Sequence, residues 1–207
     1  AGLIKAVVEN STIPVIETGV GNCHIFIDEY ADKEKAIDII INAKVQRPSV
    51  CNALETLLIH KNIINHILPE LVEELLDNNV EIRADKFIFD MFDNKNILLA
   101  TEEDWKQEFL DYILAIKCVE NIDDAISHIQ KYSTGHSEAI ITENYSNYNK
   151  FVDEIDSAVV YVNASTRFTD GEQFGHGAEI VISTQKLHER GPMGIKEITS
   201  YKYIVLG

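Results

Sequence analysis

Residues 32–60 read DKEKAIDIIINAKVQRPSVCNALETLLIH and place a helix, a turn and a strand in immediate succession. In Asp32–Lys44 the apolar residues recur at helical spacing behind an acidic capping residue, which predicts a helix. Thr56–His60 is a short apolar run, which predicts a strand. The proline turn between them carries Cys51. A helix followed directly by an apolar strand is typical of an α/β fold.

The same alternation continues along the rest of the chain. Periodicity and β-branched content predict helices over Gly2–Asn10, Pro69–Asn78, Asp123–Tyr132 and Tyr145–Glu154, and strands over Val80–Arg83, Ile113–Cys118, Ala139–Ile141 and Ala158–Val162. Strands that alternate with helices indicate a mostly parallel sheet flanked by helices. Two further segments look β-rich, namely Thr12–Glu17 and the alternating tail Glu197–Leu206, which has no evident partner strand.

The composition restricts the class of protein. The 207 residues are 45% hydrophobic and 25% charged, as in ordinary globular chains, and the net charge of −16 argues against nucleic-acid binding. Three cysteines at irregular spacing do not make a disulfide framework, and no run approaches the roughly 18 apolar residues of a membrane span. We therefore expect a cytoplasmic protein. The start at Ala1, without an initiating methionine, leads us to expect a fragment.

Cys51 is the first candidate for catalysis because of its neighbours Arg47 and Pro48. Proline is favoured in the first turn of a helix, and both the N–H groups of a helix start and a guanidinium stabilise a thiolate. We expect a short helix to begin here and to lower the pKa of the thiol. The residues alone leave open the alternative that Cys51 is a small buried hydrophobe.

Three longer stretches carry a resemblance to a known family. They are VIETGVGNCHIFID (15–28), NAKVQRPSVCNALETLLIH (42–60) and VNASTRFTDGEQFGHGAEIVISTQKLHERGPMG (162–194). They resemble gamma-glutamyl phosphate reductase (glutamate-5-semialdehyde dehydrogenase), a branch of the aldehyde dehydrogenase superfamily. The resemblance implies that branch's α/β catalytic domain over residues 18–190. Residues 1–17 would be the end of a mostly missing cofactor-binding domain, and 191–207 a segment that returns towards it and makes oligomer contacts.

The resemblance also implies a reaction. NADPH would reduce L-glutamyl 5-phosphate to L-glutamate 5-semialdehyde with release of phosphate, through a thioester on Cys51, in proline biosynthesis. Glu17 lies where the superfamily has a glutamate that activates water, and here it would be a proton shuttle or a structural carboxylate. Glu108 lies in a place similar to the glutamate that holds the nicotinamide-side ribose. The usual Gly-Pro is replaced by Asp111-Tyr112, so a surface acid is the alternative.

Arg47 and Arg167 are the candidates for binding the anionic substrate, with Ser49 near the nucleophile, because a guanidinium binds phosphate with two parallel hydrogen bonds. Arg47 could equally pair with one of the 34 acidic residues. The resemblance implies a homo-oligomer in the full-length protein and glutamate 5-kinase as a functional or fused partner. Without the cofactor domain, we expect the fragment to be inactive.

Other patterns imply no metal site. Adjacent residues such as Cys23 and His24 point to opposite faces of a strand, so they cannot share an ion. Two alternatives to the reductase remain. One is a degenerate aldehyde-dehydrogenase-like oligomerisation module, and the other is an oxidising aldehyde dehydrogenase that hydrolyses its thioester.

Overall fold

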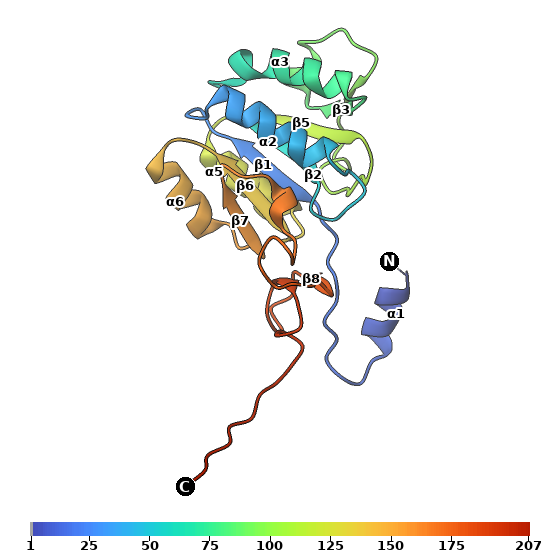
Figure 1. Cartoon of the computed structure of the whole chain (residues 1–207). Helices are drawn as coiled ribbons and strands as arrows, with labels where there is room; N and C mark the ends of the chain where they lie inside the picture. The colour runs from blue at the N-terminus through green and yellow to red at the C-terminus, as the bar shows by residue number, and fades with distance from the viewer. Residues whose placement is uncertain (1) are drawn as a thin grey trace.

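Seven strands form one sheet in the computed structural model, which describes residues 2–207 (Figure 1). The strands are β1 (Cys23–Ile27), β2 (Leu54–His60), β3 (Glu81–Ala84), β4 (Ile97–Leu99), β5 (Ile113–Val119), β6 (Ser137–Ile141) and β7 (Val159–Val162). Their order across the sheet is β4-β3-β5-β2-β1-β6-β7, and all six neighbouring pairs run parallel. The expected mostly parallel α/β sheet is confirmed.

Helices connect most of these strands. They are α1 (Gly2–Asn10), α2 (Lys33–Val45), α3 (Ile64–Asp77), α4 (Lys86–Phe89), α5 (Ile122–Tyr132), α6 (Tyr145–Glu154) and the 3₁₀ turn η1 (Thr166–Phe168). A polar cap fixes the beginning of α2, where the Asp32 carboxylate accepts the Lys35 N–H at 2.9 Å. Within residues 2–207, every helix is too short or too polar to span a bilayer.

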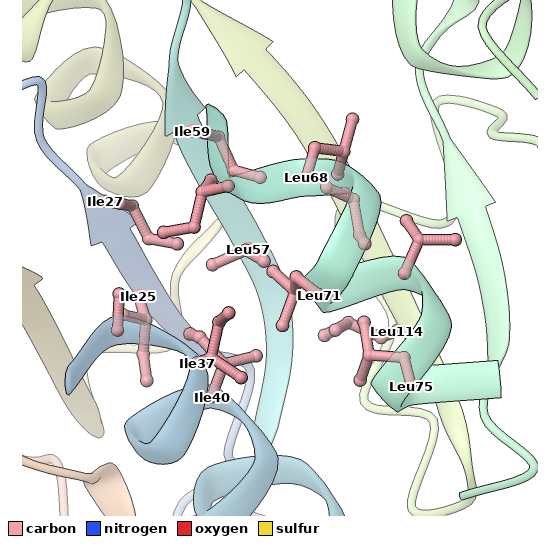
Figure 2. Packing of buried hydrophobic residues seen from close by; sticks show 14 of the residues in the cluster. Ile25, Ile27, Ile37, Ile40, Leu57, Ile59, Leu68, Leu71, Leu75 and Leu114 are labelled. Carbon is pink, nitrogen blue, oxygen red and sulfur yellow. The ribbon is translucent and has the colours of Figure 1, made fainter. Parts of the chain in front are cut away.

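The two faces of the sheet are covered by different helices, because successive side chains of a strand point to opposite sides. Ile25 of β1 and Leu57 of β2 pack against α2 and α3, as Figure 2 shows. The intervening side chains, Phe26 and Leu58, pack against α5 and α6. Complete burial of one such side chain contributes about 1.5–3 kcal/mol. Both strands at the centre of the sheet are therefore anchored from both sides.

Several sequence-based expectations about single elements are wrong. Thr12–Glu17 forms no strand, and neither does Glu197–Leu206. A strand needs a neighbour for its backbone hydrogen bonds, and no strand among residues 2–207 pairs with either segment. Figure 1 shows the C-terminal tail running away from the region of β8 as an extended segment. The antiparallel pair β8 (Val181–Ser183) and β9 (Gly191–Met193) was not expected.

A buried ion pair joins α2 to β2 beneath the turn that carries Cys51. Lys44 Nζ donates to Glu55 at 2.7 Å, and both side chains are fully buried. The other Glu55 oxygen accepts the Leu110 N–H at 3.1 Å and so holds Leu110 at its left-handed φ of 55°. Burial raises the pKa of Glu55 to about 7 and lowers that of Lys44. The folded chain thus binds a proton on Glu55 that the unfolded chain has already lost, and this contribution to stability falls as pH rises from about 4.5 to about 7.

Removal of one member of this pair should be costly. We expect Lys44→Met to lower the free energy of unfolding by about 3 kcal/mol, because it leaves Glu55 buried without its partner. The double variant Lys44→Met/Glu55→Gln should recover most of that loss, since an uncharged amide can still accept the Leu110 N–H. Urea unfolding at pH 7.5 measures both values. Lys86→Met removes an exposed pair with Asp90 and should cost less than about 0.5 kcal/mol. Equal losses for Lys44→Met and Lys86→Met would contradict a structural role for the buried pair.

Candidate active site

Cys51 lies in a turn between α2 and β2, and no helix begins there. The Ala53 N–H donates to the Val50 carbonyl at 3.0 Å, and β2 starts at Leu54. The expected helix after Pro48 is therefore wrong. The apolar residues from Leu54 onward are hydrogen-bonded to β1, which leaves too few residues for a helical turn. Any stabilisation of the thiolate must come from something other than a helix N-terminus.

The turn packs directly against the backbone of Gly21. A Cβ atom at Gly21 would lie 1.6 Å from the carbonyl oxygen of Cys51, so no other residue fits this position without displacing the turn. The Cys23 thiol donates to the same carbonyl at 3.2 Å. This close approach follows from the parallel pairing of Cys23 with Leu54 in β1 and β2. The segment before β1 and the Cys51 turn therefore form one rigid unit.

The Cys51 thiol is half-buried among charged groups. Burial raises the pKa of Cys51, and the negative charges of Glu108 and Glu179 raise it further. The backbone N–H of Cys51 and the guanidinium of Arg167 oppose this rise and lower the pKa. The expectation of a lowered thiol pKa is wrong, and the guanidinium that favours the thiolate is that of Arg167 rather than that of the neighbouring Arg47. Without a ligand, the surroundings favour the neutral thiol.

The other two thiols are less suited to chemistry. Burial raises the pKa of Cys23 well above its ordinary value, and the thiol is fully buried. Burial also raises the pKa of Cys118 to about 11, with Asp85 adding to the rise. The Cys118 side chain is half-buried. Of the three thiols, Cys51 alone has a guanidinium whose charge favours its anion.

Arg167 lies beside the Cys51 turn and Arg47 lies near Arg167. The Arg167 guanidinium donates through Nε to Gln46 Oε1 at 3.0 Å and through Nη1 to Asn52 Oδ1. Burial lowers the pKa of Arg167, and the positive charge of Arg47 lowers it further. Arg47 is exposed at the surface, as is Ser49. Two positive charges thus lie close together next to the cysteine.

Glu108 contacts the unit that contains Cys51. Its Oε1 accepts the Gly21 N–H at 2.7 Å, and the carboxylate is half-buried. The charge of Glu108 acts on the thiol, as described above. Glu108 is therefore not a remote surface acid, which was the alternative from the sequence.

Glu17 is held differently. Its backbone N–H and its Oε1 contact the side chain of Gln185, at 3.1 and 3.2 Å. The charged groups that act most strongly on the Cys51 thiol are Glu108, Glu179 and Arg167 rather than Glu17. The extended segment before β1 brings Glu17 to β8, and its role towards Cys51 stays a prediction.

Sequence reasoning missed three residues of this site. Gln46 and Asn52 bind Arg167, and Glu179 places its charge near the thiol while its Oε2 accepts the Gly171 N–H at 2.8 Å. Asn52 could have been suspected because it follows Cys51 directly. Nothing local marks Gln46 or Glu179, since their contacts come from segments more than 100 residues apart. Cys23 and His24 bond to different partners, and among residues 2–207 no group of three potential metal ligands gathers.

Comparison with known proteins gives three findings. The sequence model of the aldehyde dehydrogenase family matches residues 100–204. The gamma-glutamyl phosphate reductase of Caldanaerobacter subterraneus is 64% identical over 205 residues, which cover 99% of this chain and 49% of the relative. The gamma-glutamyl phosphate reductase of Thermotoga maritima is 61% identical over 206 residues, again 49% of its length. The chain therefore spans about half the length of the curated relatives that it matches.

Solved structures agree with the fold. The crystal structure of the Thermotoga maritima gamma-glutamyl phosphate reductase superposes with a TM-score of 0.94 and covers 100% of this chain and 49% of that one. A propionaldehyde dehydrogenase from Clostridium phytofermentans, at 21% identity, gives a TM-score of 0.66 over 90% of this chain and 50% of its own. At that identity the likeness concerns the fold alone.

Glu108 offers a direct test of the charges around the thiol. We expect Glu108→Gln to lower the pKa of Cys51 and to speed its alkylation by iodoacetamide at pH 7 by about threefold, since one negative charge near the sulfur is removed. Alkylation of the native protein across a pH series, quantified by peptide mass spectrometry, measures the midpoint pH at which half of the Cys51 thiol is ionised. Glu73→Gln, on the exposed face of α3, is the control and should leave the midpoint unchanged. A midpoint that does not move in Glu108→Gln would show that this carboxylate does not act on the thiol.

Proposed function

The chain belongs to the aldehyde dehydrogenase family, and from this premise we propose that it is the cysteine-bearing part of a gamma-glutamyl phosphate reductase. The identity of 61–64% to two curated reductases, across nearly the whole chain, supports this choice within the family. The reaction is the reduction of L-glutamyl 5-phosphate to L-glutamate 5-semialdehyde, with release of phosphate. It is a step of proline biosynthesis and takes place in the cytoplasm. The observation that carries the proposal is a half-buried cysteine with the Arg167 guanidinium held beside its turn by Gln46 and Asn52.

The first chemical step uses residues of this chain. The Cys51 thiolate attacks the acyl carbon, the bond to the phosphate oxygen breaks, and phosphate leaves with the electron pair, so that a thioester remains. Arg167 and Arg47 balance the charge of the phosphate, and Ser49 lies in the same turn. Because phosphate is a good leaving group, this step needs little help from a general acid. The backbone N–H of Cys51, which favours the thiolate, is the donor for the oxyanion.

Substrate binding changes the balance of charges around the sulfur. In the unliganded site, burial and two carboxylates raise the thiol pKa. The attacking species is the thiolate, so Arg167 has two tasks: it opposes Glu108 and Glu179, and it holds the anion beside the sulfur. Glu17, tied to Gln185, is the proton shuttle or structural carboxylate of the site.

The reduction needs a cofactor. NADPH supplies, when bound, the hydride that converts the thioester into the aldehyde. Glu108 fits a role in holding it, because this half-buried carboxylate can accept hydrogen bonds and its charge already reaches Cys51. We assign most of the cofactor site to a part of the protein outside this chain. Residues 1–17 then belong to the end of the cofactor domain, 18–190 to the catalytic domain and 191–207 to the return segment.

The assay runs in the reverse direction on the full-length protein that contains this chain. With glutamate 5-semialdehyde, phosphate and NADP⁺, we expect reduction of NADP⁺ that depends on phosphate. Cys51→Ser should lower kcat by at least about 1000-fold, because a hydroxyl is a far weaker nucleophile at neutral pH. Cys118→Ser is the control and should stay within about twofold of the parent. Turnover without phosphate would support an oxidising aldehyde dehydrogenase, and no turnover in any condition would support the oligomerisation module.

The C-terminal tail supports a further part of the proposal, a homo-oligomer. Tyr201, Tyr203 and Val205 are 83%, 85% and 90% exposed, which is unusual for large apolar side chains in a row. An extended segment with unpaired backbone groups can add to the sheet edge of another copy. Glutamate 5-kinase, which would supply the acyl phosphate, is the proposed functional partner.

Deletion of residues 197–207 tests the oligomer. We expect the native protein to shift from oligomer to monomer in size-exclusion chromatography with light scattering, because the tail would no longer bridge two copies. The double variant Lys5→Gln/Glu9→Gln removes an exposed ion pair of α1 and should leave the mass unchanged. An unchanged mass after the deletion would exclude the tail as an oligomer contact.

A further inference from the structure

Two neutral side chains hold the guanidinium of Arg167. Its Nε donates to Gln46 Oε1 at 3.0 Å, and its Nη1 donates to Asn52 Oδ1. Gln46 comes from the end of α2, and Asn52 follows Cys51 directly. An amide oxygen orients a guanidinium as a carboxylate does, but it leaves the positive charge uncompensated.

Among residues 2–207, no carboxylate forms an ion pair with this arginine, despite the acidic composition of the chain. Arg83 and Arg190 form ion pairs with Glu81 and Asp156. By contrast, within residues 2–207 no carboxylate lies within 4.0 Å of Arg47 or Arg167. Two of the four arginines therefore lack such a partner, although the chain carries 34 acidic residues against 18 basic ones.

The acidic residue nearest in sequence is already engaged. Asp170 lies three residues after Arg167, and its Oδ1 accepts the backbone N–H groups of Glu172 and Gln173 at 2.9 and 3.2 Å. Those hydrogen bonds turn its carboxylate towards the following loop. The structure therefore keeps a negative side chain close by without letting it pair with the guanidinium.

Asn52 also fixes where the guanidinium lies relative to the sulfur. Its Nδ2 donates to the Thr169 carbonyl at 2.8 Å, and its own carbonyl accepts the Thr166 hydroxyl at 2.7 Å. These bonds join the Cys51 turn to η1, the turn that carries Arg167. The asparagine is 4% exposed, so water competes little for its amide. A shift of η1 would thus require a shift of the residue next to the nucleophile.

We propose that Gln46 and Asn52 are positioning residues that present the uncompensated charge of Arg167 to an anion beside Cys51. Their neutrality, rather than their hydrogen-bonding capacity alone, makes the site select an anionic acyl compound. A pocket of about 310 Å³ leaves space next to the guanidinium, and its lining includes Gln46 and Arg167 together with Asp170 and Glu172. The identification of that anion as an acyl phosphate rests on the proposed function.

The anion preference of the sulfur can be measured without the enzymatic reaction. Iodoacetate and iodoacetamide alkylate the same thiolate, but only the first is negatively charged. The ratio of their rates at Cys51 therefore reports the local potential and cancels changes in the thiol pKa. Arg167→Gln should lower this ratio about three- to tenfold in the native protein, as expected for loss of one charge close to a partly buried site. Gln46→Glu should lower it by a similar factor, because a carboxylate of the same shape then pairs with Arg167.

Matched variants separate positioning from a general effect of charge. Gln130→Glu makes the same exchange on the exposed face of α5 and should leave the ratio within about twofold of the parent. Gln46→Met removes the acceptor without adding charge, and should lower the ratio less than Gln46→Glu does. In the Arg167→Gln background, Gln46→Glu should lower the ratio by less than about twofold, because the guanidinium it would engage is gone.

Three results would overturn the inference: an unchanged ratio in Arg167→Gln, equal effects of Gln46→Glu and Gln130→Glu, or full additivity in the double variant. Thermal unfolding of each variant excludes misfolding as the cause. The ratio does not depend on which substrate the protein uses. If the ratios behave as expected but phosphate-dependent turnover is absent, the anion site stands and the proposed reaction fails. If turnover is present but the ratios do not change, the reaction stands and the positioning role fails.

Discussion

The parallel pairing of β1 with β2 is the constraint on which the candidate site depends. It sets the residues before Cys23 beside the residues before Leu54, although they are about 30 positions apart in the chain. That pairing leaves no room for a side chain at position 21, so Gly21 can contact the Cys51 carbonyl only because it has none. Glu108 then reaches the unit through the Gly21 N–H, and Arg167 reaches it through Asn52. Glu108 and Arg167 are thus both positioned relative to the same two strands.

The electrostatics of the site are balanced rather than strongly activating. A permanently ionised thiol would react with any electrophile that reaches it, whereas burial and the charges of Glu108 and Glu179 keep the pKa of Cys51 high. Arg167 works in the opposite direction. The pKa of Cys51 depends on what occupies the site. An anion bound to Arg167 would weaken the influence that lowers this pKa, and a ligand that engages Glu108 would weaken an influence that raises it. In this arrangement, reactivity is tied to occupancy.

The sequence was informative wherever a pattern is local. The spacing of apolar residues after Asp32 gave α2, and the β-branched runs gave β2, β5 and β7 close to their observed bounds.

The sequence was misleading where two local rules compete. Pro48 suits a helix start, but the strand that begins at Leu54 takes the residues a helix would need. Pro69 likewise suggested the beginning of a helix, and instead it lies within α3, which starts at Ile64. Gln46 and Glu179 could not have been found, since their roles arise from contacts across more than 100 residues.

The buried pair of Lys44 and Glu55 has a calorimetric consequence. Because burial raises the pKa of Glu55 to about 7, the folded chain carries close to one proton more than the unfolded chain at slightly acidic pH. Unfolding there must release that proton to the buffer, whose heat of protonation then enters the measured enthalpy. Scans in phosphate and in an amine buffer at the same pH would differ in apparent enthalpy while the midpoint temperature stays the same. The buried pair beneath the Cys51 turn thus makes the folded chain a proton acceptor, and the heat of unfolding reveals it.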